Sequence, residues 1–310
     1  MKLNKPNFWD LKNSIFSILL LPFSLIVLMS ILIKKKLTKT IRFNIPIICV
    51  GNIYIGGTGK TPSSIFLAKE LFALGKNPVI LRKYYKSHID EHRLIKKKFQ
   101  NLILCQNREE GIREAEKSNF DTVILDDGLQ DYRIKKNLNI VCFNQNQLLG
   151  NGFVIPAGPL RESLNALKSA HLVLINGKKD PEFEKKVLNI NADLEIFYSY
   201  FEPINIEQFK NKKLLAIAGI GNPENFFKLL KENDLKIEKK LFFPDHYEFT
   251  KAEIKSIVED AKNKNLQIIM TEKDYYKIEN FNIHEIEYLK LSLKIINKTS
   301  FIQTIRRFYD

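Results

Sequence analysis

The stretch that decides the fold is IICVGNIYIGGTGKTP, from Ile47 to Pro62. An apolar run typical of a buried strand leads into a glycine-rich turn that ends Gly59-Lys60-Thr61, and a helix is predicted to follow. Glycines let backbone N–H groups converge on phosphate oxygens, Lys60 reaches the β- and γ-phosphates, and the Thr61 hydroxyl binds Mg²⁺. The stretch therefore predicts a loop that binds the phosphates of a nucleotide.

One position of this loop departs from the strict pattern. G-x-x-x-x-G-K-[ST] has glycine where this chain has Tyr54, and Gly56 and Gly57 supply the flexibility inside the loop instead. A glycine turn that binds nothing is the alternative, but the strand, the loop, the Lys-Thr pair and the helix all favour phosphate binding. The predicted nucleotide-binding residues are Tyr54, Ile55, Gly56, Gly57, Thr58, Gly59, Lys60 and Thr61.

A second motif, DTVILDDGLQD, runs from Asp121 to Asp131. Its apolar strand delivers Asp126 and Asp127 at the carboxyl end, where parallel sheets bind ligands. Alone, Asp-Asp-Gly is usually a turn, but together with a phosphate loop it predicts a Mg²⁺ site. We therefore expect Thr61, Asp126 and Asp127 to be the metal ligands, although neighbouring side chains on a strand point to opposite faces.

Composition is that of a globular protein. The chain has 310 residues, 45% of them hydrophobic and 27% charged, which excludes a collagen, a disordered tail or a disulfide-stabilised miniprotein and suggests about two domains. The formal charge of +14 favours anionic partners such as phosphates, nucleic acid or an acidic membrane surface. Cys49, Cys105 and Cys142 lie in separate apolar runs, so we expect buried thiols rather than disulfides or a zinc site.

Short β-rich runs alternate with helical spacing along the rest of the chain, which predicts an α/β fold with a mostly parallel sheet. We expect an N-terminal segment at 1–36, a P-loop NTPase-like domain at 37–200, and a smaller α/β domain at 201–310. The weakly patterned stretch 191–211 is the expected link between the two domains.

The N-terminal segment contains an uncharged run from Asn13 to Ile33, long enough as a helix to cross a bilayer. Pro22 interrupts the run and both of its flanks are basic, which favours an obliquely inserted anchor whose two ends stay in the cytosol. A buried helix in a soluble core is the alternative. We expect membrane attachment.

Seven motifs together resemble the tetraacyldisaccharide 4′-kinase family, the bacterial lipid A kinases. They are VGNIYIGGTGKTP at Val50, IDE at Ile89, LDDGLQD at Leu125, PAGPLRES at Pro156, AIAGIGNPENFF at Ala216, FPDHYEFT at Phe243 and MTEKDYYK at Met270. Their order and spacing agree over essentially the whole chain. The family's S-R-G-Y-G stretch appears as Leu81-Arg82-Lys83-Tyr84-Tyr85, without either glycine, and its G-D-E-P stretch appears as Ile89-Asp90-Glu91-His92.

The resemblance implies an ATP- and Mg²⁺-dependent kinase that phosphorylates the 4′-hydroxyl of a tetraacylated glucosamine disaccharide 1-phosphate, giving lipid IVA. It also implies that Asp90 and His246 are a catalytic pair, with Lys60 as a third catalytic residue. Further candidates for phosphate or substrate contacts are Glu91, Arg108, Gln130 and Arg161. We expect the enzyme at the inner membrane, on an anionic surface, with its catalytic domains on the cytosolic face.

Two other classes of protein are less consistent with the sequence. A GTPase switch needs [NT]-K-x-D after a strand, but in Thr271-Glu272-Lys273-Asp274 the lysine comes one position late. A nucleic-acid-dependent ATPase would explain the positive charge, but no recognised nucleic-acid module appears. We therefore expect no nucleic-acid partner, and nothing in the sequence implies an obligate protein partner.

Overall fold

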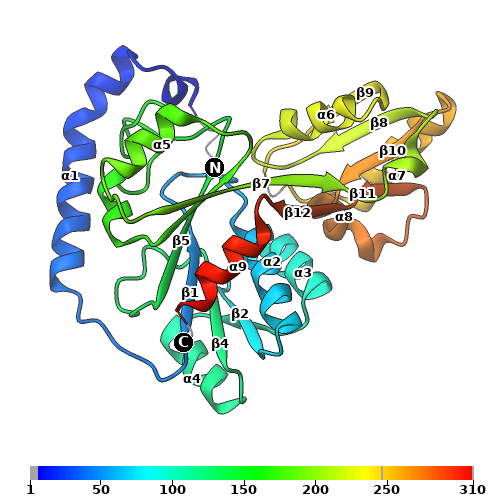
Figure 1. Ribbon diagram of the computed structural model, residues 1–310. Coiled ribbons are helices and arrows are strands. Elements are labelled where there is room, and N and C mark those ends of the chain that lie inside the picture. The colour runs from blue at the N-terminus through cyan, green and yellow to red at the C-terminus, as the bar shows by residue number, and fades with distance from the viewer. Residues whose placement is uncertain (1–5, 246, 309–310) are drawn as a thin grey trace. The chain divides into compact units, whose positions relative to one another are not determined.

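The computed structural model describes residues 6–245 and 247–308, and the chain divides into two compact units (Figure 1). Unit 1 comprises residues 1–83, 101–200 and 293–310, and unit 2 comprises residues 84–100 and 201–292. The polypeptide therefore passes between the units four times, at each of the boundaries between these segments.

The larger sheet has eight strands in the order β12-β7-β6-β5-β1-β4-β2-β3. Its strands are β1 (Ile47–Gly51), β2 (Pro78–Lys83), β3 (Leu102–Cys105), β4 (Thr122–Asp126), β5 (Leu138–Asn144), β6 (Leu172–Asn176), β7 (Glu195–Pro203) and β12 (Leu291–Ile295). The helices of unit 1 are α1 (Ile15–Leu37), α2 (Lys60–Ala73), α4 (Arg108–Lys117), α5 (Pro181–Leu188) and α9 (Lys298–Arg306). The strands from β3 to β7 in this order pair in parallel, which confirms the expected fold class.

The central strands are almost entirely buried because both faces of a parallel sheet are covered. On one face, the side chains of β1, β2 and β4 pack with apolar residues of α4 and α5. Two of the three cysteines, Cys49 and Cys142, are buried thiols as expected, and Cys105 is partly buried. Burial raises the pKa of Cys49 to about 11, so this thiol stays neutral.

Strand order brings the two predicted motifs together. β1 lies between β4 and β5, and Val50 at its carboxyl end is in register with Asp126 at the end of β4. The chain leaves β1 toward β2 and later returns to β5 on the other side of β1, so this is the topological switch point at which parallel sheets bind ligands.

Unit 2 has a four-stranded parallel sheet in the order β11-β10-β8-β9. Its elements are β8 (Lys213–Ala218), β9 (Lys236–Phe242), β10 (Gln267–Thr271), β11 (Ile286–Leu289), α3 (Ile89–Lys98), α6 (Pro223–Glu232), α7 (Lys251–Asn263) and α8 (Glu272–Ile278). Alternate residues of β8 and β10 enter two separate cores, one with α6 and one with α7. This alternation covers both faces of the sheet.

Three segments depart from the contiguous domains that we expected. Residues 84–100 belong to unit 2 because α3 packs on α8, where Lys98 pairs with Glu272 at 2.6 Å. Residues 293–310 belong to unit 1, where Phe301 of α9 packs on aromatic rings of α2 and β7. The stretch 191–211 is not a plain link, since it contains the nine-residue strand β7.

The N-terminal apolar run forms α1, which continues through Pro22 and along the outside of unit 1 (Figure 1). In α1 the buried residues are polar and most of the large apolar residues face outward, the opposite of a soluble amphipathic helix. The buried residues of α1 are Ser17 and Ser24, whereas ten of its large apolar side chains are more than half exposed: Ile15, Phe16, Ile18, Leu19, Phe23, Leu25, Ile26, Met29, Leu32 and Ile33. Only 11% of the most apolar 18-residue stretch of α1 is buried, so the alternative of a core helix is wrong.

Candidate active site

The phosphate loop joins β1 to α2 as the sequence predicted. Gly59, at φ +88°, caps the N-terminus of α2 in the left-handed region, a conformation that side-chain-bearing residues rarely adopt. The loop interior is held by Asn52, whose amide donates to the Thr58 hydroxyl at 2.9 Å. Gly56 and Gly57 are exposed at the tip, so the loop presents backbone and the helix N-terminus outward, where anions bind.

A second segment, residues 159–161, forms backbone hydrogen bonds with the first part of the loop. The Ile55 N–H donates to the Pro159 carbonyl at 2.9 Å, and the Arg161 N–H donates to the Ile53 carbonyl at 2.7 Å. Tyr54, which replaces the glycine of the strict pattern, is fully buried in a small apolar cluster with Val154 and Leu160. Tyr54 therefore acts as a packing residue of the loop, and its side chain is turned away from solvent.

Asp126 lies at the centre of a buried polar cluster with three partners. Thr61 Oγ1 donates to its Oδ2 at 3.0 Å, and Ser64 Oγ donates to its Oδ1 at 3.0 Å. Arg82, from the neighbouring strand β2, forms an ion pair with the same carboxylate and donates to Thr61 Oγ1 at 3.1 Å. The structure thus brings Thr61 and Asp126 together as predicted, and adds an arginine that sequence reasoning did not select.

Asp127 has its own set of cations. Its carboxylate accepts from Arg161 Nη1 at 2.8 and 3.1 Å and lies 3.8 Å from Lys60 Nζ. Burial by itself would raise the pKa of Asp127, but the charges of Lys60 and Arg161 outweigh burial and hold the pKa below its ordinary value. Asp127 is therefore ionised at neutral pH, and it holds Lys60 and Arg161 beside the phosphate loop.

The other two candidates of unit 1 hold the backbone of the site. Arg108 Nη2 donates to the Asp127 carbonyl at 2.7 Å, and its Nη1 lies 3.6 Å from a carboxylate oxygen of Asp131. Gln130 Nε2 donates to the Asn52 carbonyl at 2.9 Å, just before the phosphate loop. Both residues are near the predicted site, but in this structure their side chains bond to the protein itself and hold its backbone in place.

Asp90 and Glu91 lie in unit 2, in the first turn of α3, beside two lysines of α8. Lys273 Nζ lies 3.6 Å from an Asp90 oxygen and 3.2 Å from a Glu91 oxygen, and Lys277 Nζ lies 3.8 Å from Asp90. Burial lowers the pKa of Lys273, but the carboxylates of Glu91, Asp245 and Asp90 outweigh it and hold the pKa above its ordinary value. Asp90 is thus a buried carboxylate beside two cations.

His246 lies outside the described residues, so its distance from Asp90 is not part of the structure. Its neighbour Asp245 is described, and it bonds to Lys273 Nζ at 3.0 Å. Asp245 and Asp90 therefore share one lysine within unit 2. The expected domain boundaries had assigned Asp90 and His246 to different domains.

The sequence resembling a guanine-reading motif has a structural role. Thr271 caps α8, and the fully buried Asp274 accepts hydrogen bonds from the Gly219 N–H at 2.7 Å and from the Thr271 hydroxyl at 2.6 Å. Lys277 pairs with the other carboxylate oxygen of Asp274 at 2.7 Å. Both carboxylate oxygens of Asp274 therefore already bond within the protein and are not available to bind a guanine base. The GTPase alternative rested on this motif and loses that support.

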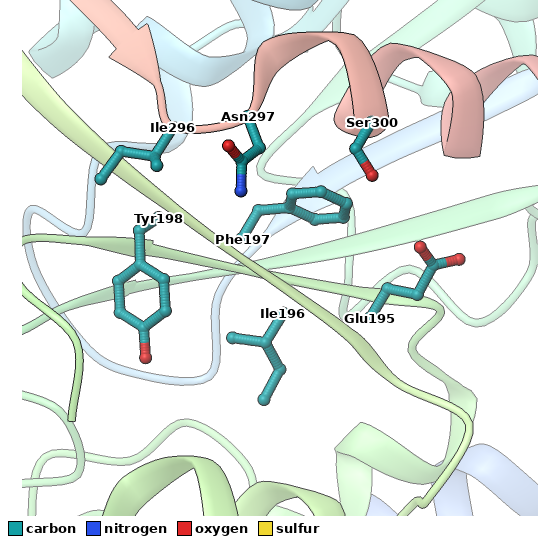
Figure 2. Close-up of a pocket in the computed structure, with 7 residues that line it drawn as sticks. All are labelled: Glu195, Ile196, Phe197, Tyr198, Ile296, Asn297 and Ser300. Atoms are coloured by element: carbon teal, nitrogen blue, oxygen red, sulfur yellow. The ribbon is translucent and has the colours of Figure 1, made fainter. Parts of the chain in front are cut away.

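A separate pocket lies in unit 1 between β7 and the start of α9 (Figure 2), with a volume of about 350 Å³. Glu195, on its wall, accepts hydrogen bonds from the Thr304 hydroxyl at 2.7 Å and from Arg307 at 3.0 Å. None of the predicted site residues lines this pocket. Its chemistry therefore does not add to the phosphate site.

The residues of the phosphate site fit Mg²⁺. Within residues 6–245 and 247–308, no group of three or more His, Cys, Asp or Glu side chains gathers as a metal site. Mg²⁺ in nucleotide sites needs only one or two protein oxygens because phosphates and waters complete its shell. The hydroxyl of Thr61 and the carboxylate of Asp126, 3.0 Å apart, are oxygens of that kind.

A parallel sheet with a glycine-rich Lys-Thr loop after its central strand, and an aspartate at the end of the next strand, defines a P-loop nucleotide-binding protein. The family model described as tetraacyldisaccharide-1-P 4′-kinase matches residues 16–310. The chain belongs to this family. It is therefore an ATP-dependent kinase that phosphorylates a tetraacyldisaccharide 1-phosphate at its 4′-position, in lipid A biosynthesis.

Individual relatives agree with this assignment. A tetraacyldisaccharide 4′-kinase of Pelagibacter ubique is 44% identical over 301 residues, which cover 95% of each chain. One from Rickettsia canadensis is 36% identical, with 96% of this chain and 95% of the relative covered. Among solved structures, LpxK from Aquifex aeolicus in complex with ATP superposes with a TM-score of 0.75 at 23% identity, covering 96% of this chain and 100% of that one. The last similarity concerns the fold.

Proposed function

We propose that the phosphate site of unit 1 binds ATP and that Asp90 of unit 2 serves as the base for the 4′-hydroxyl of the lipid. The support for the first part is the arrangement of Lys60 and Thr61 beside Asp126 and Asp127 at the switch point of the sheet. Phosphoryl transfer needs little covalent chemistry from the protein, so catalysis rests on positioning and on charge. The product is lipid IVA, the 1,4′-bisphosphate.

In this proposal each side chain has one task. Lys60 and Arg161 neutralise negative charge on the phosphates, and Asp127 holds both cations in position. Thr61 and Asp126 would hold Mg²⁺, which would supply positive charge that stabilises the phosphates. Asp90 accepts the proton of the sugar hydroxyl, and His246 orients Asp90. Glu91 lies next to Asp90 and shares Lys273 with it, which makes it a candidate for substrate contact.

The direct test is an assay of purified protein with ATP, Mg²⁺ and tetraacyldisaccharide 1-phosphate. The expected result is a product that carries a new phosphate on the 4′-hydroxyl, with ADP formed in equal amount. GTP in place of ATP should support little product. Hydrolysis of ATP without any lipid product would contradict the proposed substrate, whereas no nucleotide binding at all would contradict the phosphate site.

The second part of the proposal concerns the membrane. An acylated substrate leaves the bilayer only at a cost of about 0.8 kcal/mol per buried CH₂, so the enzyme must act where the lipid is. The exposure of α1 supports attachment there, because most of its large apolar side chains face away from the rest of unit 1. Lys34, Lys35 and Lys36 in its last turn suit an anionic surface. We place the enzyme at the inner membrane, with the catalytic units in the cytosol.

The contact of α1 with the rest of unit 1 explains why two of its serines, Ser17 and Ser24, are buried. Ser24 Oγ donates to the Val154 carbonyl at 2.7 Å and accepts from the Ala157 N–H at 3.0 Å. Ser17 Oγ, about two turns earlier, accepts from the Asn151 amide at 2.9 Å. The two serines therefore lie on the protein-facing side of α1, and its other sides remain for lipid.

Substitutions on the two sides of α1 are expected to have opposite effects. Leu19→Ser with Ile26→Ser should weaken binding to vesicles containing phosphatidylglycerol by at least about 10²-fold, because each apolar side chain contributes about 1.5–3 kcal/mol when buried in lipid. Its melting temperature should not change. Ser24→Ala should instead lower the melting temperature by a few degrees and leave vesicle binding intact. Co-sedimentation measures vesicle binding, and thermal unfolding measures the melting temperature. If the double variant sediments with vesicles as the wild type does, α1 does not contribute to membrane binding.

The two aspartates after β4 are expected to differ in their metal dependence. Asp126→Asn and Asp127→Asn should each lower kcat by roughly 10²–10³, since each removes a charge from the site. Only Asp126→Asn should raise the Mg²⁺ concentration needed for half-maximal rate, because only Asp126 bonds to Thr61. Asp121→Asn, in the residue just before the same strand, is the matched control. Equal Mg²⁺ requirements in the two variants would contradict the assignment of Asp126 as the metal ligand.

A further inference from the structure

An arginine is paired with the predicted metal ligand in the interior of unit 1. Arg82 on β2 is in register with Asp126 on β4, and their side chains form an ion pair. Arg82 is only 6% exposed and Asp126 is fully buried. A buried carboxylate without a partner is costly, so Asp126 needs a cation close by whenever the protein is folded.

The same arginine also contacts the second predicted metal ligand. Arg82 Nη1 donates to Thr61 Oγ1 at 3.1 Å, and Thr61 Oγ1 in turn donates to Asp126 Oδ2, the oxygen with which Arg82 pairs. One positively charged nitrogen thus touches both oxygens expected to hold Mg²⁺. A metal ion bound directly to both oxygens would need the position that this nitrogen occupies, and the two cations would repel each other.

The other cations of the site do not take this role. Lys60 and Arg161 pair with Asp127, and Arg108 pairs with Asp131. Ser64 completes the environment of Asp126 with a neutral hydrogen bond to its second oxygen. Arg82 is therefore the cation that balances Asp126 among the described ion pairs.

We propose that Arg82 is a built-in counter-ion that takes the place of the metal between Thr61 and Asp126, and that Mg²⁺ must displace it when it arrives with the nucleotide. The inference rests on the proposed function, in which these two residues hold Mg²⁺. It follows that Arg82 stabilises the metal-free protein and weakens binding of a free metal ion. The site then becomes selective for metal that is already bound to nucleotide, since phosphate contacts help to displace the arginine.

The test measures metal binding without turnover. Mn²⁺ serves as a spectroscopic substitute for Mg²⁺, and its dissociation constant is measured by electron paramagnetic resonance on nucleotide-free protein. Arg82→Met should bind Mn²⁺ at least about tenfold more tightly than the wild type, since the competing charge is gone. Its melting temperature should fall in EDTA and recover when Mn²⁺ is added. Arg161→Met, which loses an ion pair to Asp127, should show no such recovery.

A second variant keeps the test decisive if Arg82→Met folds poorly. Arg82→Lys retains the buried charge but lacks the forked guanidinium that bonds to two partners, so its affinity for Mn²⁺ should lie between the wild type and Arg82→Met. Mn²⁺ affinities equal to the wild type in the folded variants would overturn the proposal. A wild type that binds Mn²⁺ poorly even with ADP would instead contradict the metal site itself, and so the proposed function.

Discussion

Lys60→Ala is expected to lower kcat by at least roughly 10²–10³, while the protein remains folded. The ammonium of Lys60 lies beside the phosphate loop and 3.8 Å from Asp127, and in the proposed function it neutralises charge that develops on the transferred phosphoryl group. Its removal costs little stability, because Asp127 keeps its shorter bonds to Arg161. Steady-state kinetics with the lipid substrate, together with thermal melting of the same preparation, measure the two effects separately.

Lys69→Ala is the matched control for this prediction. Lys69 lies on the same helix, α2, and is exposed, so its loss should change neither rate nor melting temperature beyond a few tenths of a kcal/mol. If Lys60→Ala keeps near-normal kcat with unchanged KM for ATP, the phosphate loop has no part in the chemical step. A loss of rate together with a large loss of stability would indicate a structural role for Lys60.

Asp90→Asn should have the largest effect among substitutions in unit 2, a loss of roughly 10²–10⁴ in kcat with little change in KM for ATP. The amide is nearly the same size as the carboxylate but cannot accept the hydroxyl proton. Lys273 and Lys277 would lose a nearby charge, yet both keep other carboxylates, at Glu91 and Asp274. Glu91→Gln is the comparison, with an expected loss of less than about tenfold. A larger loss in Glu91→Gln than in Asp90→Asn would transfer the role of base to Glu91.

The link between Asp90 and His246 can be measured by a double-mutant cycle. His246→Ala should cost as much as Asp90→Asn or less, and the double variant should lose far less than the product of the two, because both residues act on one proton. The position of Asp245, which shares Lys273 with Asp90, motivates the pair. Strictly multiplicative losses would separate His246 from Asp90 and leave it as a residue of a turn.

Some features of the sequence correctly predicted the fold because their cause is local. The phosphate loop is one continuous strand, turn and helix, and its glycines and its Lys-Thr pair act through backbone geometry within a few residues. Helices such as α4 and α7 follow from apolar spacing. The strand β7 escaped notice because its side chains are mostly half-buried, so its apolar pattern is weak.

The assignment of α3 also needed more than local pattern. Its helical spacing is visible in the sequence, but its neighbours are not. α3 packs on α8, nearly two hundred residues later in the chain, through pairs such as Arg93 and the Tyr276 carbonyl at 2.9 Å. Contacts of this separation depend on the whole path of the chain, so a domain boundary read along the sequence placed Asp90 in a different unit from the one in which α3 packs.

The sequence by itself determined the P-loop class, the uncharged run that makes α1 a membrane helix candidate, and, by resemblance, the family together with the catalytic residues that it predicts. Only the tertiary structure decided how those residues are paired. The sequence shows Arg82 only as an arginine near the end of an apolar strand. Its partner Asp126 lies on β4, which is the neighbour of β2 only because of the order of strands in the sheet. Likewise, Ser17 and Ser24 are unremarkable in an apolar run until Asn151, Val154 and Ala157 meet them. The energy of a buried polar group depends on what surrounds it in space, and the crossovers between strands, which local pattern does not encode, determine those surroundings.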